Sequence, residues 1–240
     1  MPEHIDRKEL KKDEVRDTIM HGADAVMSHK TLTTLLVVVA VLIAAAIFGW
    51  KTYTEHQTVK AEAAFDDAKK VFLAPVAGAS QPPLPGETTY PNDQAKYTEA
   101  AKKFADVATT YPHTRPGQLA AYYAALSDEK INKNDDAKKW LQGLADGNME
   151  DFAAMAKFEL AQINDRSGNG DEAVKLYQQL MAKPTVLVPK PVVMLALAAH
   201  YGQKNPTEAA KLYTQIKTDY PDTPIAQQAD QGLNLLPGKS

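Results

Sequence analysis

The heptapeptide TEAAKKF at residues 98–104 has three near-copies further along the chain, and this recurrence indicates a helical repeat fold. The copies are DDAKKWL (135–141), DEAVKLY (171–177) and TEAAKLY (207–213), and their third-position alanines are 37, 36 and 36 residues apart. Four residues after each alanine stands a large apolar residue: Phe104, Leu141, Tyr177 and Tyr213. A small and a large residue at i and i+4 share one helix face, so another helix can approach the alanine and pack against the large side chain. A period of this length is typical of solenoids built from helix pairs.

A second recurring phrase lies outside these heptapeptides. YPHTRPGQLA begins at Tyr111 and YPDTPIAQQA begins at Tyr220, each 11 residues after the key alanine of the first or the fourth copy. Proline cannot continue a helix, so the phrase marks a helix end. Thr114 and Thr223 are then expected to cap the helix that follows. The two intervening copies leave their helices through GNMED and AKPTV instead.

These features together resemble the tetratricopeptide repeat (TPR), a helix pair of about 34 residues whose pattern includes A-x3-F followed by proline. The Leu160-Ala161 pair in the second helical stretch adds to the resemblance. The copies here are slightly longer, and Asp128 and Asn164 stand where that repeat carries an aromatic residue. The resemblance covers residues 92–236. It implies a TPR-like α-solenoid of antiparallel helix pairs. The expected fold class is all-α, with a single N-terminal transmembrane helix before the solenoid.

The transmembrane helix is expected from twenty uncharged residues between Lys30 and Lys51, TLTTLLVVVAVLIAAAIFGW. At a rise of 1.5 Å per residue this stretch spans about 30 Å, the thickness of a bilayer's hydrocarbon core. Trp50 closes it, as interfacial aromatic residues do. A cleaved signal peptide is the alternative, but the apolar run is longer than the roughly 7–15 residues of a signal core. The sequence therefore favours a retained membrane helix.

The predicted organisation has six segments. The leader carries a thin apolar stripe, which suits either a solvated tail or docking on a membrane or a partner. The Pro-rich loop contains Pro82 and Pro85 at PxxP spacing, which fits either a plain linker or a polyproline ligand. In order, the segments are a charged cytoplasmic leader (1–30), a transmembrane helix (31–50), a helical extension (51–73), a Pro-rich loop (74–91), TPR-like repeats (92–236) and a tail (237–240).

Composition and motifs argue against an enzyme. The net charge of −3 does not suggest nucleic acid, and the absence of cysteine removes disulfides and thiol chemistry. The six histidines are scattered, so no metal site is expected, and no phosphate-binding loop or hydrolase motif occurs. Acidic pairs such as Asp135-Asp136 are explained by the positive end of a helix dipole. We therefore expect no catalytic residue, no cofactor, no metal and no small-molecule substrate.

A partner-binding groove is the expected functional feature, because the first helix of each solenoid unit lines the concave side. The residues placed there include aromatic, Met and Arg side chains, which are enriched at protein interfaces. Each of them can equally serve inter-helix packing. With a register fixed to within one residue, they are Leu119, Tyr122, Leu126, Lys130, Met155, Phe158, Gln162, Arg166, Met194 and, further along the same helix, Tyr201.

The order of segments resembles the bitopic bacterial TPR proteins that are ancillary subunits of the Sec translocon. This resemblance implies a bacterial inner-membrane protein with a cytoplasmic N-terminus and a periplasmic TPR domain. The orientation rests on the resemblance, since the basic residues around the span do not set it. It implies a chaperone-like adaptor for unfolded, exported or envelope proteins beside the translocon. The PPLPG insertion departs from the pattern. The alternatives are a structural scaffold subunit of a larger membrane complex and, with the opposite topology, a cytoplasmic TPR domain.

Overall fold

The computed structural model describes residues 30–77 and 88–237. Within these residues there are nine α-helices and no strand, which confirms the all-α class with TPR-like repeats. The predictions for the leader, for PPLPG and for the last three residues lie outside the described residues. The division into six segments stays a prediction. The structure itself separates two units, Met1–His56 and Gln57–Ser240, which are described one at a time.

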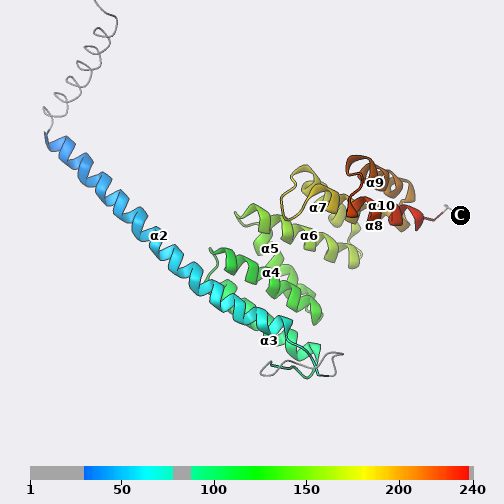
Figure 1. Cartoon of the computed structure of the whole chain (residues 1–240), viewed down its shortest axis with the longest axis horizontal. Coiled ribbons are helices and arrows are strands. Elements are labelled where there is room, and N and C mark those ends of the chain that lie inside the picture. The colour runs from blue at the N-terminus through cyan, green and yellow to red at the C-terminus, as the bar shows by residue number, and fades with distance from the viewer. Residues whose placement is uncertain (1–29, 78–87, 238–240) are drawn as a thin grey trace, which may run out of the picture. The chain divides into compact units, whose positions relative to one another are not determined.

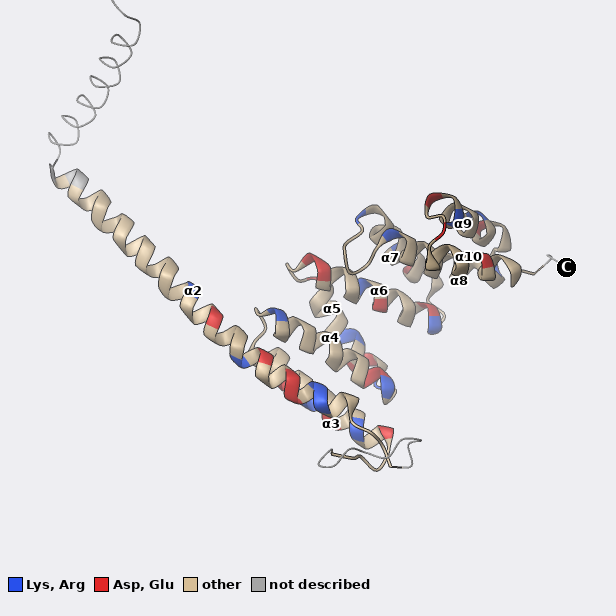
Figure 2. Ribbon diagram, in the orientation of Figure 1, with Lys and Arg blue, Asp and Glu red and all other residues tan. Residues whose placement is uncertain are grey.

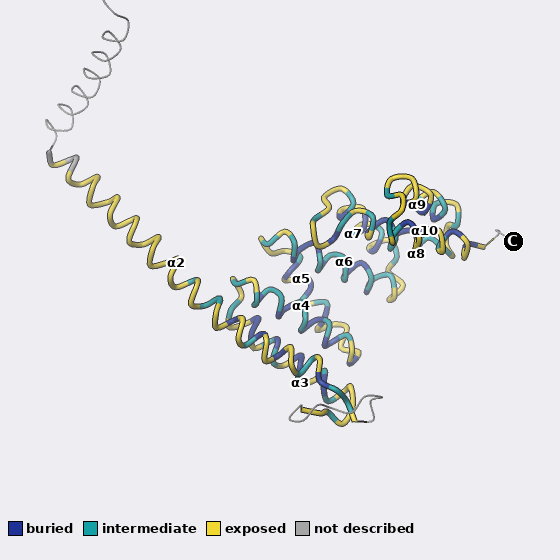
Figure 3. Tube along the Cα trace, viewed as in Figure 1, coloured by how far each residue is buried: buried dark blue, intermediate teal, exposed yellow. Residues whose placement is uncertain are grey.

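Helix α2 (Lys30–Leu73) runs without a break through the uncharged stretch and the predicted extension. From Thr34 to His56 its apolar side chains are exposed, including Leu42, Ile43 and Phe48. Figure 2 shows α2 from Thr34 to Trp50 without charged residues, and Figure 3 shows the same stretch exposed. It is long and apolar enough to cross a membrane. Exposed apolar surface along a whole helix is stable in lipid and costly in water.

The remaining helices stack in chain order, each against the next (Figure 1). Helices α4, α6 and α8 are the first helices of their units, and α5, α7 and α9 are the second helices. Helix α10 packs on both α8 and α9. The bounds are α3 (Asp93–Thr110), α4 (Arg115–Lys130), α5 (Asn134–Ala145), α6 (Glu150–Arg166), α7 (Gly170–Ala182), α8 (Lys190–Lys204), α9 (Pro206–Asp219) and α10 (Pro224–Asn234).

The repeated small–large pairs form the core, as their spacing predicted. The four alanines are fully buried, and each large partner is at most 6% exposed. They sit in second helices, so that every first helix packs against an alanine and its apolar neighbour. The alanines are Ala100, Ala137, Ala173 and Ala209, and their partners are Phe104, Leu141, Tyr177 and Tyr213.

Helix ends are fixed by the residues that the sequence indicated. The hydroxyl of Thr114 accepts a hydrogen bond from the Gly117 amide (3.1 Å), and that of Thr223 accepts one from the Ala226 amide (3.3 Å). Both threonines are N-caps, as predicted, and they satisfy amides that the first turn leaves without partners. Acidic pairs occupy the first turns of α5 and α7, where their charge meets the positive helix end.

The C-terminal part of α2 packs against α3. The ring of Phe65 lies 5.5 Å from that of Phe104, and Phe72 lies 5.2 Å from Tyr123 on α4. Ala61 is fully buried four residues before Phe65, the same small–large spacing as in the repeats. This segment therefore provides the first helix of a further unit.

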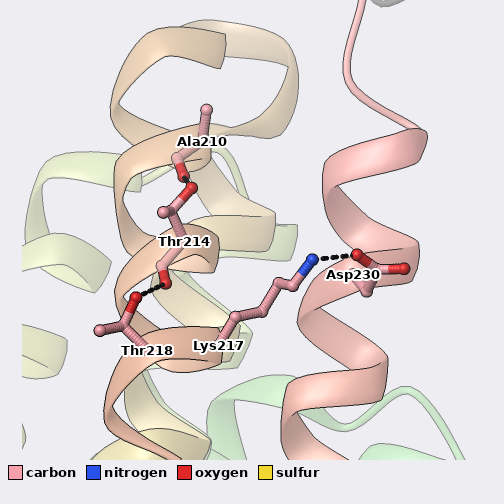
Figure 4. A network of polar contacts seen from close by, with 5 residues as sticks. All are labelled: Ala210, Thr214, Lys217, Thr218 and Asp230. Atoms are coloured by element: carbon pink, nitrogen blue, oxygen red, sulfur yellow. Dashed lines mark hydrogen bonds and ion pairs between the residues drawn. The ribbon is translucent and has the colours of Figure 1, made fainter. Parts of the chain in front are cut away.

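The last two helices are joined by a polar contact at their surface. The ammonium of Lys217 on α9 donates to the carboxylate of Asp230 on α10 (Figure 4). Both side chains are exposed, so the pair contributes little stability and mainly orients two surfaces that apolar residues already hold together.

Candidate functional site

The residues predicted for the groove lie on α4, α6 and α8, but their environments differ. Lys130 and Arg166 are exposed, and Met194 is only 1% exposed. Met194 packs in the apolar cluster shared by α8, α9 and α10, so its side chain is not available to a binding partner. The other six residues of α4 and α6 are half-buried: Leu119, Tyr122, Leu126, Met155, Phe158 and Gln162.

A pocket of about 480 Å³ brings two of these residues together, Leu119 and Met155. Its floor is apolar, with Phe65 from α2 and Phe152 from α6 beside them. The rim carries three charged side chains and the loop between α7 and α8. Those rim residues are Glu62 and Asp66 of α2, Arg115 and Pro116 of α4, and Leu187 of the loop.

The local sequence fixes the α4 wall of this pocket. The Tyr-Pro turn and the Thr114 cap set where α4 begins, and Arg115 and Pro116 form its first turn. The Arg115 guanidinium lies over the ring of Phe152, 5.4 Å from the centroid, which is a cation–π contact between α4 and α6. Phe152 itself is buried, so its ring holds the guanidinium in place at the rim.

The rest of this face is crossed by polar contacts between successive first helices. The Tyr122 hydroxyl donates to Glu159 (3.0 Å), and Arg166 donates to Glu129 (2.5 Å). Burial raises the pKa of Tyr122, and the Glu159 carboxylate adds to this, so the phenol stays a proton donor. Burial also raises the pKa of Glu129, while Arg166 opposes the shift. Tyr122 and Arg166 thus join neighbouring units.

His200 forms the corresponding contact between α6 and α8. Its Nδ1 lies 2.6 Å from a carboxylate oxygen of Asp165, and the imidazole is nearly enclosed. His200 is therefore a packed histidine that joins two helices. Within the described ranges, no group of three or more His, Asp or Glu side chains could hold a metal ion.

Phe158 serves packing as well as surface. Its ring meets that of Tyr177 edge to face, with centroids 6.0 Å apart, and it borders the apolar cluster of α6, α7 and α8. Truncation of Phe158 would therefore change stability together with any binding. The pocket residues that protrude, such as Leu187, are cleaner probes of a surface.

A larger hollow of about 760 Å³ runs along α9 and offers less chemistry. Two of its hydroxyls turn back to their own helix: Thr214 donates to the Ala210 carbonyl and Thr218 to the Thr214 carbonyl (Figure 4). Such hydroxyl donors are already used within the helix. We therefore regard the pocket between α2, α4 and α6 as the candidate site.

Sequence reasoning missed the walls contributed by α2 and by the α7–α8 loop. The signal for α2 was present in Ala61 and Phe65, a small–large pair that precedes the first counted copy. For the loop, the signal was the apolar run TVLV in a segment that otherwise reads as a helix exit. Val186 is 87% exposed and Leu187 is 48% exposed, so this loop presents apolar side chains to solvent.

Comparison with protein families supports this repeat architecture. A family model described as tetratricopeptide repeat-like domain matches residues 28–186, and a model described as tetratricopeptide repeat matches residues 193–223. The first match begins before the uncharged part of α2 and includes all of the pocket except Leu187. Comparison with curated proteins and with solved structures gives no match.

Proposed function

The chain belongs to the tetratricopeptide repeat-like domain family, and from this premise we propose that it is a membrane-anchored adaptor that binds other proteins on the face of α4 and α6. Repeat proteins of this class present extended surfaces to partners and are typically without catalytic activity. The observation that carries the proposal is the pocket, whose apolar floor and charged rim come from three successive first helices.

The anchor is the uncharged part of α2. Thr31–Trp50 carries no charge, and its side chains from Thr34 onward are exposed, which suits a lipid environment. We propose a single span with the N-terminus in the cytoplasm of a bacterium and the repeats in the periplasm. The resemblance to bitopic TPR proteins supports this orientation, and the absence of cysteine suits an oxidising compartment.

The partners we propose are unfolded, exported or envelope proteins that pass the Sec translocon. Support comes from the resemblance to its ancillary subunits and from a pocket that could receive an apolar side chain. The second candidate, a scaffold that holds one fixed partner of a membrane complex, would use the same face. The number of different partners separates the two functions.

Site-specific photocrosslinking in intact membranes tests the adaptor. One photoreactive residue replaces Arg115 at the pocket rim, and a matched one replaces Lys175, an exposed position on the second helix α7. Many different proteins captured at position 115 alone would support the adaptor, and one recurring membrane protein would support the scaffold. Equal capture at the two positions would refute binding on this face.

The orientation has its own test, since the chain has no cysteine. A single cysteine at the exposed Asn169 should react with a membrane-impermeant maleimide once the periplasm is accessible and before the inner membrane is opened. Labelling that requires cell lysis would place the repeats in the cytoplasm.

A further inference from the structure

We propose that the pocket between α2, α4 and α6 binds one bulky apolar side chain of an extended partner segment that carries Lys or Arg two residues away. This inference rests on the proposed adaptor function and names the partner chemistry that its pocket selects. It follows from three features of the pocket: an open apolar floor, unpaired carboxylates on one wall, and the limited extent of the free surface.

The floor is apolar and remains open to solvent. Leu119 and Met155 expose part of their side chains there, beside the buried Phe65 and Phe152. Leu187 also lines the pocket, with about half of its surface exposed. The volume of about 480 Å³ lies within the roughly 300–1,000 Å³ typical of ligand pockets. An aromatic or branched side chain can therefore enter and exchange water for apolar contact.

The α2 wall is negatively charged. Glu62 and Asp66 stand four residues apart on one helix face, are exposed, and form no ion pair with any residue that the structure describes. Like charges at this spacing repel each other slightly. Arg115 is the one cation among the described residues that line the pocket, and it is held over Phe152 instead. Two carboxylates and one guanidinium leave a net negative rim, which favours a basic residue of the partner.

The extent of the free surface decides the partner's conformation. The pocket lies at the N-terminal ends of α4 and α6, whereas Tyr122–Glu159 joins the middle of these helices and Arg166–Glu129 joins their C-terminal ends. A docked helix needs anchors over two or more turns. An extended segment needs one pocket only, and its residues i and i+2 point to the same side about 7 Å apart. An apolar residue in the pocket thus directs a Lys or Arg at i±2 toward the α2 wall.

Disulfide tethering to the full-length protein in detergent measures this preference, because the chain has no cysteine of its own. Val186→Cys places a thiol on the exposed loop beside Leu187, and Gln178→Cys on α7 is the matched control. The probes are short Gly/Ser peptides that carry a cysteine and a central Lys-Ser-Phe-Ser-Lys, Lys-Ser-Ser-Ser-Lys or Glu-Ser-Phe-Ser-Glu. The measured quantity is the fraction of the protein that is disulfide-linked to the peptide at a fixed concentration of reductant.

At position 186 we expect the Phe probe with lysines to be tethered at least about tenfold more than the probe without Phe, from burial of one aromatic side chain. It should exceed the glutamate probe by about two- to fivefold, the range of an exposed ion pair. Glu62→Lys with Asp66→Lys should reverse the charge preference and keep the Phe preference. Leu187→Ser should reduce tethering of both Phe probes, and no probe should be favoured at position 178.

Two results would overturn the inference: equal tethering of all probes at position 186, or a lysine preference that survives the charge reversal. Circular dichroism and melting of each variant, whose changed residues are exposed, check that the fold is intact. Failure here with selective photocrosslinking at position 115 would leave the adaptor proposal standing. Selective tethering without any capture in membranes would instead refute the adaptor and keep the pocket chemistry.

Discussion

Replacement of Gly117 by alanine tests how the first Tyr-Pro turn positions the pocket wall. A Cβ atom on residue 117 would lie 1.9 Å from the carbonyl oxygen of Tyr111 and 2.7 Å from its carbonyl carbon. These are backbone atoms, so no side-chain rotation relieves the overlap. The turn or the start of α4 must move, and Arg115 and Leu119 would move with it.

The cost of this change follows from two opposing effects. Forcing extra atoms into a packed site costs about 1–3 kcal/mol. Replacing glycine by alanine in a helix returns up to about 1 kcal/mol. We expect a net loss of about 1–2 kcal/mol, which at a urea dependence of about 2 kcal/mol per molar lowers the unfolding midpoint by about 0.5–1 M. Urea denaturation of the full chain followed by circular dichroism measures this shift.

The second Tyr-Pro turn supplies the matched control, because Ala226 stands there at the position of Gly117. The two turns differ in the backbone of their third residue. Asp222 has φ of 58°, whereas His113 is not among the described non-glycine residues with positive φ. Asp visits the left-handed region more readily than most residues. Combining His113→Asp with Gly117→Ala should therefore let the first turn adopt the second turn's form and recover most of the loss.

Two outcomes would refute this reasoning. A midpoint for Gly117→Ala at or above that of the unchanged chain would mean that the Tyr111 carbonyl yields freely and helix propensity dominates. If His113→Asp with Gly117→Ala has no higher urea midpoint than Gly117→Ala alone, a left-handed backbone at residue 113 does not make room for the methyl group. Ala226→Gly should lose only about 1 kcal/mol, from helix propensity.

Three further predictions concern stability. Ala173→Glu places a charge at a fully buried helix contact and should cost more than about 3 kcal/mol; an unchanged melting temperature would show that the repeat register is wrong. Burial raises the pKa of Tyr177 to about 12. The folded protein therefore loses stability as the pH rises from about 10, where an unfolded tyrosine ionises, toward 12. Tyr177→Phe should weaken this alkaline decline in melting temperature. A double-mutant cycle on Lys217 and Asp230 should give a coupling below about 1 kcal/mol, because both side chains are exposed, and a larger value would contradict a merely orienting role.

The sequence alone was sufficient for the repeat, for the buried small–large pairs and for the threonine caps. These features depend on residues within one or two helical turns, such as Ala173 with Tyr177 or Thr223 with Ala226. Their spacing maps directly onto one helix face, so no knowledge of distant packing is needed. The uncharged stretch of α2 is equally local, because its length and composition make it a membrane-span candidate.

Which predicted surface residues are exposed, and which segments complete the pocket, depends on packing between helices that are distant in sequence. Met194 stands 36 residues after the half-buried Phe158, yet it is buried because it packs into the apolar cluster with α9 and α10. Glu62 and Leu187 reach the rim shared by Leu119 and Met155 only when α2 and the α7–α8 loop fold against α4 and α6. Periodicity identifies the face of a helix, but which part of that face stays uncovered depends on chain segments far away in sequence.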